Sequence, residues 1–140
     1  MSRIIALDYG SKRTGIAVTD PLRIVPTGLD TIETKNLFPF LNEYFSKENV
    51  GIIVIGYPTH LDGNDTYLTK EIDEFLKIFV TKYPHIIVFK QSEWFTSKQA
   101  KAVILQSGIS KSKRRDKSLI DKISAVIILE EFMQSKIYKI

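Results

Sequence analysis

The chain has 140 residues, of which 44% are hydrophobic, and a formal net charge of +4. This length suits one hydrophobic core, so we expect a single domain over residues 1–140. The absence of cysteine excludes a disulfide scaffold, a thiolate nucleophile and any Cys-ligated zinc or iron–sulfur site, and it fits a reducing cytosol. No signal peptide and no apolar run of the roughly 20 residues that a membrane span needs is found, so we expect a soluble cytoplasmic protein without contact to membranes.

The N-terminal stretch places a carboxylate at the end of an apolar run. A buried strand, a turn and a returning strand are predicted over residues 4–7, 10–15 and 16–19, which together make a hairpin. An ionised Asp8 at the end of a core strand costs free energy unless donors, a cation or a metal neutralises it. Asp8 is therefore a candidate for chemistry. Alternatively, it only holds the turn by accepting the backbone N–H groups of Gly10 and Ser11.

The rest of the chain predicts strands that alternate with helices. The expected elements are a strand over 29–33, a helix with Asn36 as its N-cap, a strand over 50–55, a helix from Asp65 or Thr66 to about residue 82, a strand over 86–89, a helix from Thr96 or Ser97 to Gly108, and a buried helix from about Ser118 to Gln134. This order predicts an α/β fold. Its five-stranded sheet is mixed, with antiparallel first strands followed by parallel ones, and is flanked by helices.

Three acidic residues stand where such a fold can bring them together. If the first strand lies mid-sheet, its end with Asp8 comes close to Glu93, just past the fifth strand, and Asp121 lies in the first turn of the last helix. Three converging carboxylates repel one another unless a divalent cation lies between them. Mg²⁺ or Mn²⁺ suits oxygen-only ligands, and two such ions can activate water and stabilise the departing oxygen of a phosphodiester. This is nuclease chemistry.

These acids also have purely structural interpretations. Asp121 with Ser118 fits a helix-capping pair, and Glu93 fits a solvated loop residue. Further acids beside turn residues are interpreted as turn formers; these are Asp20, Asp62 and Asp65.

Cations gather in residues 111–117, which hold five Lys or Arg and one Asp. This segment is compatible with phosphate contacts, although a run of charges is more often a solvated loop. Lys12 and Arg13 add two cations in the first turn. Trp94 could stack on a base if it were exposed, although aromatic side chains are more often part of a core.

Three blocks of the sequence resemble the YqgF (RuvX) family of Holliday junction resolvases, which are also assigned to ribosomal RNA precursor processing. The blocks are DYGSKRTGIAVTD at 8–20, IVIGYPTHLDG at 53–63 and IDKISAVIIL at 120–129. The resemblance implies an RNase H-like fold, a divalent-metal nuclease site and nucleic-acid substrates. By position, it also implies that the family's acidic triad is Asp8, Glu93 and Asp121.

One block departs from the family pattern. The family usually has Asp-Glu-Arg after the last strand, whereas this chain has Ser92-Glu93-Trp94. The missing Arg removes a planar, permanently charged donor suited to bidentate phosphate contact. Lys12, Arg13 or the basic segment could supply that charge instead.

The leading hypothesis is a metal-dependent endonuclease acting on structured nucleic acid, either ribosomal RNA precursor or branched DNA. Asp8, Glu93 and Asp121 would bind Mg²⁺ or Mn²⁺ and carry catalysis. The expected nucleic-acid contacts are Lys12, Arg13, Lys113, Arg114, Arg115 and Trp94. A second hypothesis is a nucleic-acid-binding module with weak or no catalysis. A third, an ATPase of the actin or sugar-kinase type, is disfavoured because such enzymes clamp nucleotide between two domains.

Overall fold

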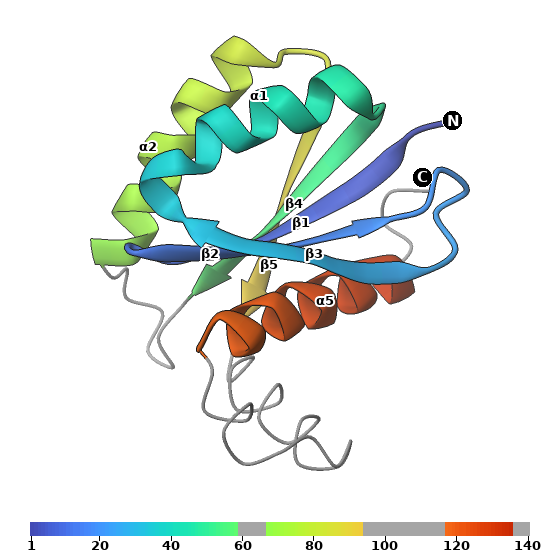
Figure 1. Ribbon diagram of the computed structural model, residues 1–140. Helices are drawn as coiled ribbons and strands as arrows, with labels where there is room; N and C mark the ends of the chain where they lie inside the picture. The colour runs from blue at the N-terminus through green and yellow to red at the C-terminus, as the bar shows by residue number, and fades with distance from the viewer. Residues whose placement is uncertain (59–66, 94–116, 136–140) are drawn as a thin grey trace.

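The computed structural model describes residues 1–58, 67–93 and 117–135 (Figure 1). The elements are β1 (Arg3–Tyr9), β2 (Arg13–Thr19), β3 (Pro26–Glu33), the 3-10 helix η1 (Thr34–Asn36), α1 (Leu37–Lys47), β4 (Val50–Pro58), α2 (Tyr67–Lys82), β5 (Ile87–Glu93) and α5 (Lys117–Ser135). The helix expected over 96–108 lies outside the described residues. None of the helices in the described ranges is both long and apolar enough to cross a membrane.

The strands form one sheet in the order β3-β2-β1-β4-β5. The pairs β1–β2 and β2–β3 are antiparallel, whereas β1–β4 and β4–β5 are parallel. The prediction of a mixed five-stranded sheet with antiparallel first strands is therefore confirmed. β1 lies at its centre, which explains why residues 4–7 are an unbroken apolar run: all four side chains are fully buried.

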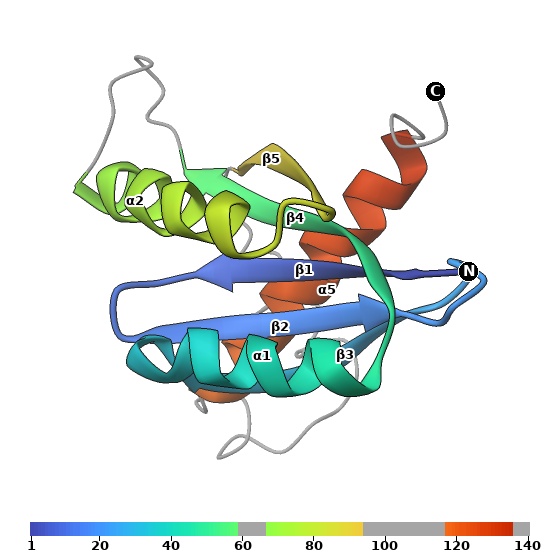
Figure 2. The same cartoon turned by 90° about the horizontal axis from the view of Figure 1, so that it is seen from above.

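Helices α1 and α2 cover one face of the sheet and α5 covers the other (Figures 1 and 2). Successive residues of a strand point to opposite faces, so β1 contributes to two cores. Ile5 and Leu7 belong to the core beneath α1 and α2, while Ile4 and Ala6 belong to the core beneath α5. Asp8 continues the second series, and this alternation directs its carboxylate toward α5.

Several element boundaries differ from the sequence predictions. The first turn is shorter than expected, because β2 already begins at Arg13 and Thr14 is buried opposite Tyr9. The expected strands over 29–33, 50–55 and 86–89 are longer in the structure. Asn36 is the N-cap residue of α1, as predicted, but its side chain makes no capping hydrogen bond; the 3-10 helix η1 leads directly into α1 at this point.

Two glycines allow the first turns of α5 to lie close against the sheet. A Cβ at Gly15 in β2 would overlap with the backbone carbonyl of Asp121. A Cβ at Gly28 in β3 would instead meet the flexible side chain of Lys122, at 2.8 Å from its Cγ. Gly15 thus permits a backbone-to-backbone approach that any larger residue would prevent.

We expect Gly15→Ala to lower the free energy of unfolding by about 3 kcal/mol, because the helix backbone must move away from the sheet. Gly28→Ala should cost clearly less, since a lysine side chain can rotate aside. Urea unfolding of both variants, followed by circular dichroism, provides the measurement. Equal stability of Gly15→Ala and the unchanged protein would show that α5 is not packed here as described.

A carboxylate pair where β1 meets α5

Asp8 lies near the end of β1, opposite Gly15 in the antiparallel ladder. Asp121 is the fifth residue of α5, and the close approach at Gly15 brings this part of the helix to the same point. The two carboxylates are near enough for the charge of Asp121 to affect the ionisation of Asp8. The structure therefore brings together two of the three predicted acids, from positions far apart in the chain.

The environment of Asp8 disfavours its negative charge. Burial raises the pKa of Asp8 from 3.8 to about 7, and repulsion from Asp121 acts in the same direction. A positive charge beside Asp8 would counter both effects, because it favours the ionised form. The ionised form of Asp8 would therefore be stabilised by a nearby cation.

Asp121 already has a cationic partner. Nε of Arg13 donates to Oδ2 of Asp121 at 3.0 Å, and the two side chains are 39% and 21% exposed. The expected capping pair was wrong, because α5 begins at Lys117 and Ser118 is therefore inside the helix. For the same reason Asp121 lies just beyond the first turn of α5, whereas the sequence predicted it within that turn.

The first turn is held by groups other than Asp8. The Gly10 carbonyl accepts a hydrogen bond from the Thr34 hydroxyl at 2.5 Å, and the Ser11 hydroxyl donates to Glu71 at 2.9 Å. The causes of the Asp8 pKa shift include no backbone hydrogen bond, so the alternative in which Asp8 serves only to hold the N–H groups of Gly10 and Ser11 receives no support from the described residues. Asp8 remains available for a different role.

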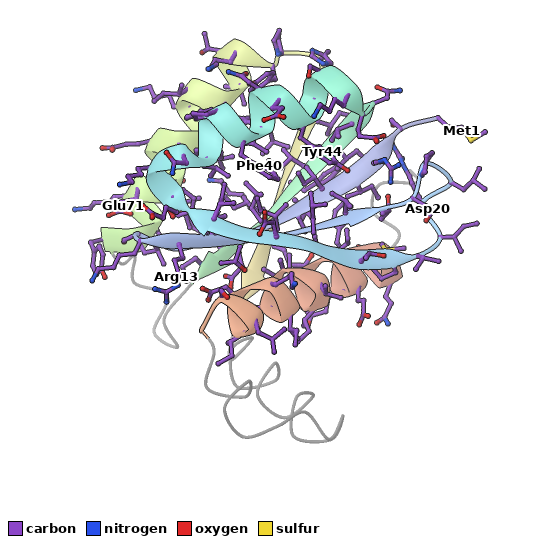
Figure 3. The ribbon with its side chains drawn as sticks, viewed as in Figure 1. Met1, Arg13, Asp20, Phe40, Tyr44 and Glu71 are labelled. Atoms are coloured by element: carbon purple, nitrogen blue, oxygen red, sulfur yellow. The ribbon has the colours of Figure 1, made fainter. Side chains whose placement is uncertain are left out.

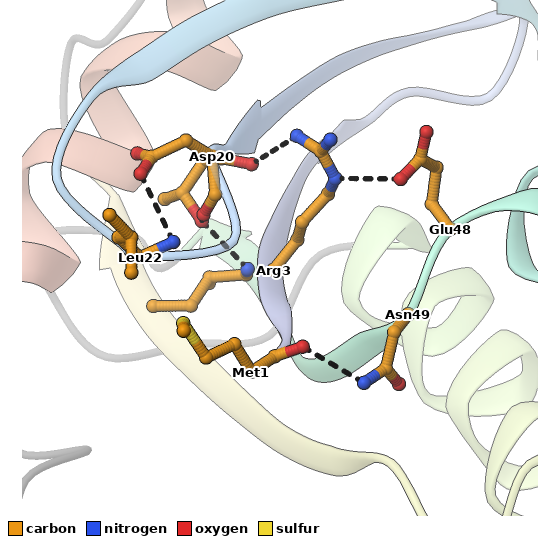
Figure 4. A network of polar contacts seen from close by, with 8 residues as sticks. Met1, Arg3, Asp20, Leu22, Glu48 and Asn49 are labelled. Carbon is orange, nitrogen blue, oxygen red and sulfur yellow. Dashed lines mark hydrogen bonds and ion pairs between the residues drawn. The ribbon is translucent and has the colours of Figure 1, made fainter.

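The acid that does act as a turn former is Asp20, at the opposite end of the hairpin (Figure 4). Its carboxylate accepts backbone N–H bonds from Leu22, Ile24 and Val25 at 3.1, 2.8 and 2.6 Å. These bonds, with that of Val25 the strongest, lower the pKa of Asp20. The structural interpretation of Asp20 is confirmed, whereas Asp62 and Asp65 lie outside the described residues.

Glu93 is the last residue of β5, where its backbone pairs with Pro58 at the end of β4. It was expected just past a strand over 86–89, so the predicted end of this strand was four residues too early. Its side chain lies outside the described part of the structure, as do Trp94, Lys113, Arg114 and Arg115. Among the described residues alone, no three acidic or histidine side chains form a metal-binding group.

A polar cluster at the β4–β5 edge was missed in the sequence. The Tyr57 hydroxyl donates to Asp73 of α2 at 2.9 Å, and Nζ of Lys90 lies 3.0 Å from the same carboxylate and 4.5 Å from the Tyr57 ring centre. Burial acts to raise the pKa of Asp73, but the bonds from Lys90 and Tyr57 outweigh it, so the net shift is downward. The available signal was Lys90, the cation that directly follows the apolar residues 87–89 of β5.

A family model described as RuvX, Holliday junction resolvase, matches residues 2–135. The chain belongs to the RuvX family. A protein of Christiangramia forsetii named "Putative pre-16S rRNA nuclease" is 46% identical over 133 residues, which cover 95% of this chain and 98% of that protein. A Porphyromonas gingivalis protein of the same name is 44% identical, over 96% of this chain and 98% of its own length.

Solved structures of RuvC from Thermus thermophilus share the fold of this RuvX chain. RuvC in complex with a Holliday junction substrate matches with a TM-score of 0.58 at 12% identity, over 99% of this chain and 97% of that chain. A second structure of Thermus thermophilus RuvC matches with a TM-score of 0.54 at 11% identity. At this identity the likeness shows the fold alone, and the expected RNase H-like fold is confirmed.

The raised pKa of Asp8 predicts an unusual pH dependence of stability. Between the ordinary value of 3.8 and about 7, the folded protein holds a proton that the unfolded chain releases, so stability falls as the pH rises through this window. In chelator, Asp8→Asn should therefore be more stable than the unchanged protein at pH 8, by at least about 1 kcal/mol. The gain should shrink toward pH 4.

Asp20→Asn is the contrasting variant for this measurement by thermal unfolding. The pKa of Asp20 is lowered by the loop amides, so this substitution should reduce stability at pH 8. A destabilised Asp8→Asn at pH 8 would contradict the burial of an uncompensated carboxylate at the end of β1.

Proposed function

We propose that this chain is a single nuclease domain that hydrolyses phosphodiester bonds of structured nucleic acid with the help of a divalent metal ion. Membership in a nuclease family supports the reaction type. The observation that carries the site is the meeting of Asp8 and Asp121 where β1 ends against α5. Two carboxylates forced together, one of them partly buried, form a negatively charged site that favours a cation over water alone.

The residues at this point fit a hard divalent ion. Carboxylate oxygens are the preferred ligands of Mg²⁺ and Mn²⁺, and we propose Asp8, Glu93 and Asp121 as the set that holds one or both. When bound, the ion supplies Lewis-acid activation of water and of the phosphate group. The chain itself holds the ion and orients the strand to be cut.

The proposed contacts to the nucleic-acid backbone are cationic. Lys12 is exposed in the first turn, and Arg13 follows it at the start of β2. Lys113, Arg114 and Arg115 are proposed as a second set of phosphate contacts, and Trp94 as a stacking surface. Because these cations would neutralise phosphates, nucleic-acid binding should weaken as the salt concentration rises.

We propose ribosomal RNA precursor as the substrate, because relatives at 41–46% identity carry the name of a pre-16S rRNA nuclease. Branched DNA is the second candidate, because the family description names a Holliday junction resolvase. A substrate made during ribosome assembly also favours action in the cytoplasm. A binding module without catalysis remains the alternative that Trp94, in place of an Arg, favours.

The test is cleavage of ribosomal RNA precursor and of a four-way DNA junction, each with Mg²⁺, Mn²⁺ or chelator. We expect metal-dependent cutting, and a loss of at least about 100-fold in Asp8→Asn and in Asp121→Asn. Asp30→Asn is the matched control, since Asp30 is an exposed acid of β3 that bonds only the adjacent Thr31 amide in the described structure.

Equal cutting by Asp8→Asn and the unchanged protein would contradict the assignment of the site. Binding that survives chelation, with no cutting of either substrate, would instead establish the binding module.

A further inference from the structure

We propose that Arg13 and the divalent ion compete for the Asp121 carboxylate. Arg13 is then the counter-ion of Asp121 in the metal-free protein and becomes a phosphate contact once the ion is bound. This inference rests on the proposed function, because it concerns the same site. It makes Arg13 a positioning residue that links metal binding to nucleic-acid binding.

The observation is an ion pair between residues 108 positions apart in the chain. Arg13 is the first residue of β2, and Asp121 lies in the second turn of α5. The ion pair therefore joins the hairpin to the helix that carries the proposed metal ligand. Figure 3 shows Arg13 at this end of the sheet, near the start of α5. The Nε–Oδ2 distance of 3.0 Å is that of a direct, charge-assisted hydrogen bond.

Arg13 and the divalent ion cannot both bind the Asp121 carboxylate at full strength at the same time. An ion bound to Asp121 would place a double positive charge within a few ångströms of the Arg13 guanidinium, where like charges repel strongly. Arginine cannot relieve this repulsion by losing its proton, because a guanidinium stays protonated in proteins. The guanidinium must therefore move away, or the ion must bind more weakly.

Arg13 is placed so that moving away costs little. Its side chain is 39% exposed, and an ion pair that is partly open to water is weak. Lys12 beside it is exposed, so the freed guanidinium joins an existing cationic turn. Planar guanidinium groups bind phosphate oxygens in a bidentate manner.

The consequence is cooperative binding. If the ion releases Arg13 for a phosphate, then nucleic acid that captures Arg13 must also favour the ion, by the same factor. In the metal-free protein Arg13 is occupied by Asp121 and contributes little to nucleic-acid affinity. Lys12 has no such partner among the described salt bridges, so its contribution should not depend on metal.

The first test measures Mn²⁺ affinity by isothermal titration calorimetry in the absence of nucleic acid. We expect Arg13→Gln to bind Mn²⁺ about 3- to 10-fold more tightly than the unchanged protein, because the competitor is gone. Lys12→Gln is the matched control, since it removes the same charge one residue away; its affinity should change less than about twofold. Arg13→Lys keeps a cation there and should stay closer to the unchanged protein.

The second test measures nucleic-acid affinity by fluorescence anisotropy with a four-way DNA junction and an RNA hairpin. Ca²⁺ replaces Mn²⁺, and denaturing gels check that the strands stay intact. We expect Arg13→Gln to weaken binding about 10-fold with Ca²⁺ and less than about twofold in chelator. Lys12→Gln should weaken binding by a similar factor in both conditions.

A third measurement needs no variant. The Nε–Hε signal of Arg13 in a nitrogen-15 spectrum reports its bond to Asp121, and titration with Mg²⁺ should shift this signal. An unchanged signal, or Mn²⁺ affinity in Arg13→Gln equal to or weaker than that of the unchanged protein, would overturn the competition. Cleavage by the unchanged protein would then leave the proposed function standing. A protein that neither binds Mn²⁺ nor cuts would overturn both.

Discussion

The contact between the backbone of α5 and Gly15 of β2 is the constraint on which the site depends. Because Gly15 has no side chain, the second turn of α5 lies directly against the strand that pairs with β1. This approach carries Asp121 to Asp8 and within reach of Arg13. A larger residue at Gly15 would separate these groups without touching any of them.

The same packing creates an electrostatic imbalance. α5 covers the face of β1 from which Asp8 projects, so the carboxylate loses water and its pKa rises to about 7. Arg13 compensates Asp121 but leaves Asp8 without a comparable partner among the described salt bridges. In the proposed function a divalent ion would supply the missing charge, which would link the architecture of the sheet to nuclease chemistry.

Much of this arrangement could be predicted from residue patterns. The unbroken apolar run at 4–7 indicated a central strand, and the order of elements indicated where Asp8 and Asp121 would meet. Local patterns could not predict the early start of β2, which depends on Thr14 being buried between two neighbouring strands. Nor could they predict the Arg13–Asp121 pair, because that contact exists only after α5 packs on the sheet.

The most direct test is a crystal of this protein soaked in Mn²⁺, with anomalous diffraction recorded at the manganese edge. The account predicts an anomalous peak within coordination distance, about 2.2 Å, of carboxylate oxygens of both Asp8 and Asp121, with the Arg13 guanidinium turned away from the helix. A peak elsewhere on the molecule, with Arg13 still bonded to Asp121, would contradict it.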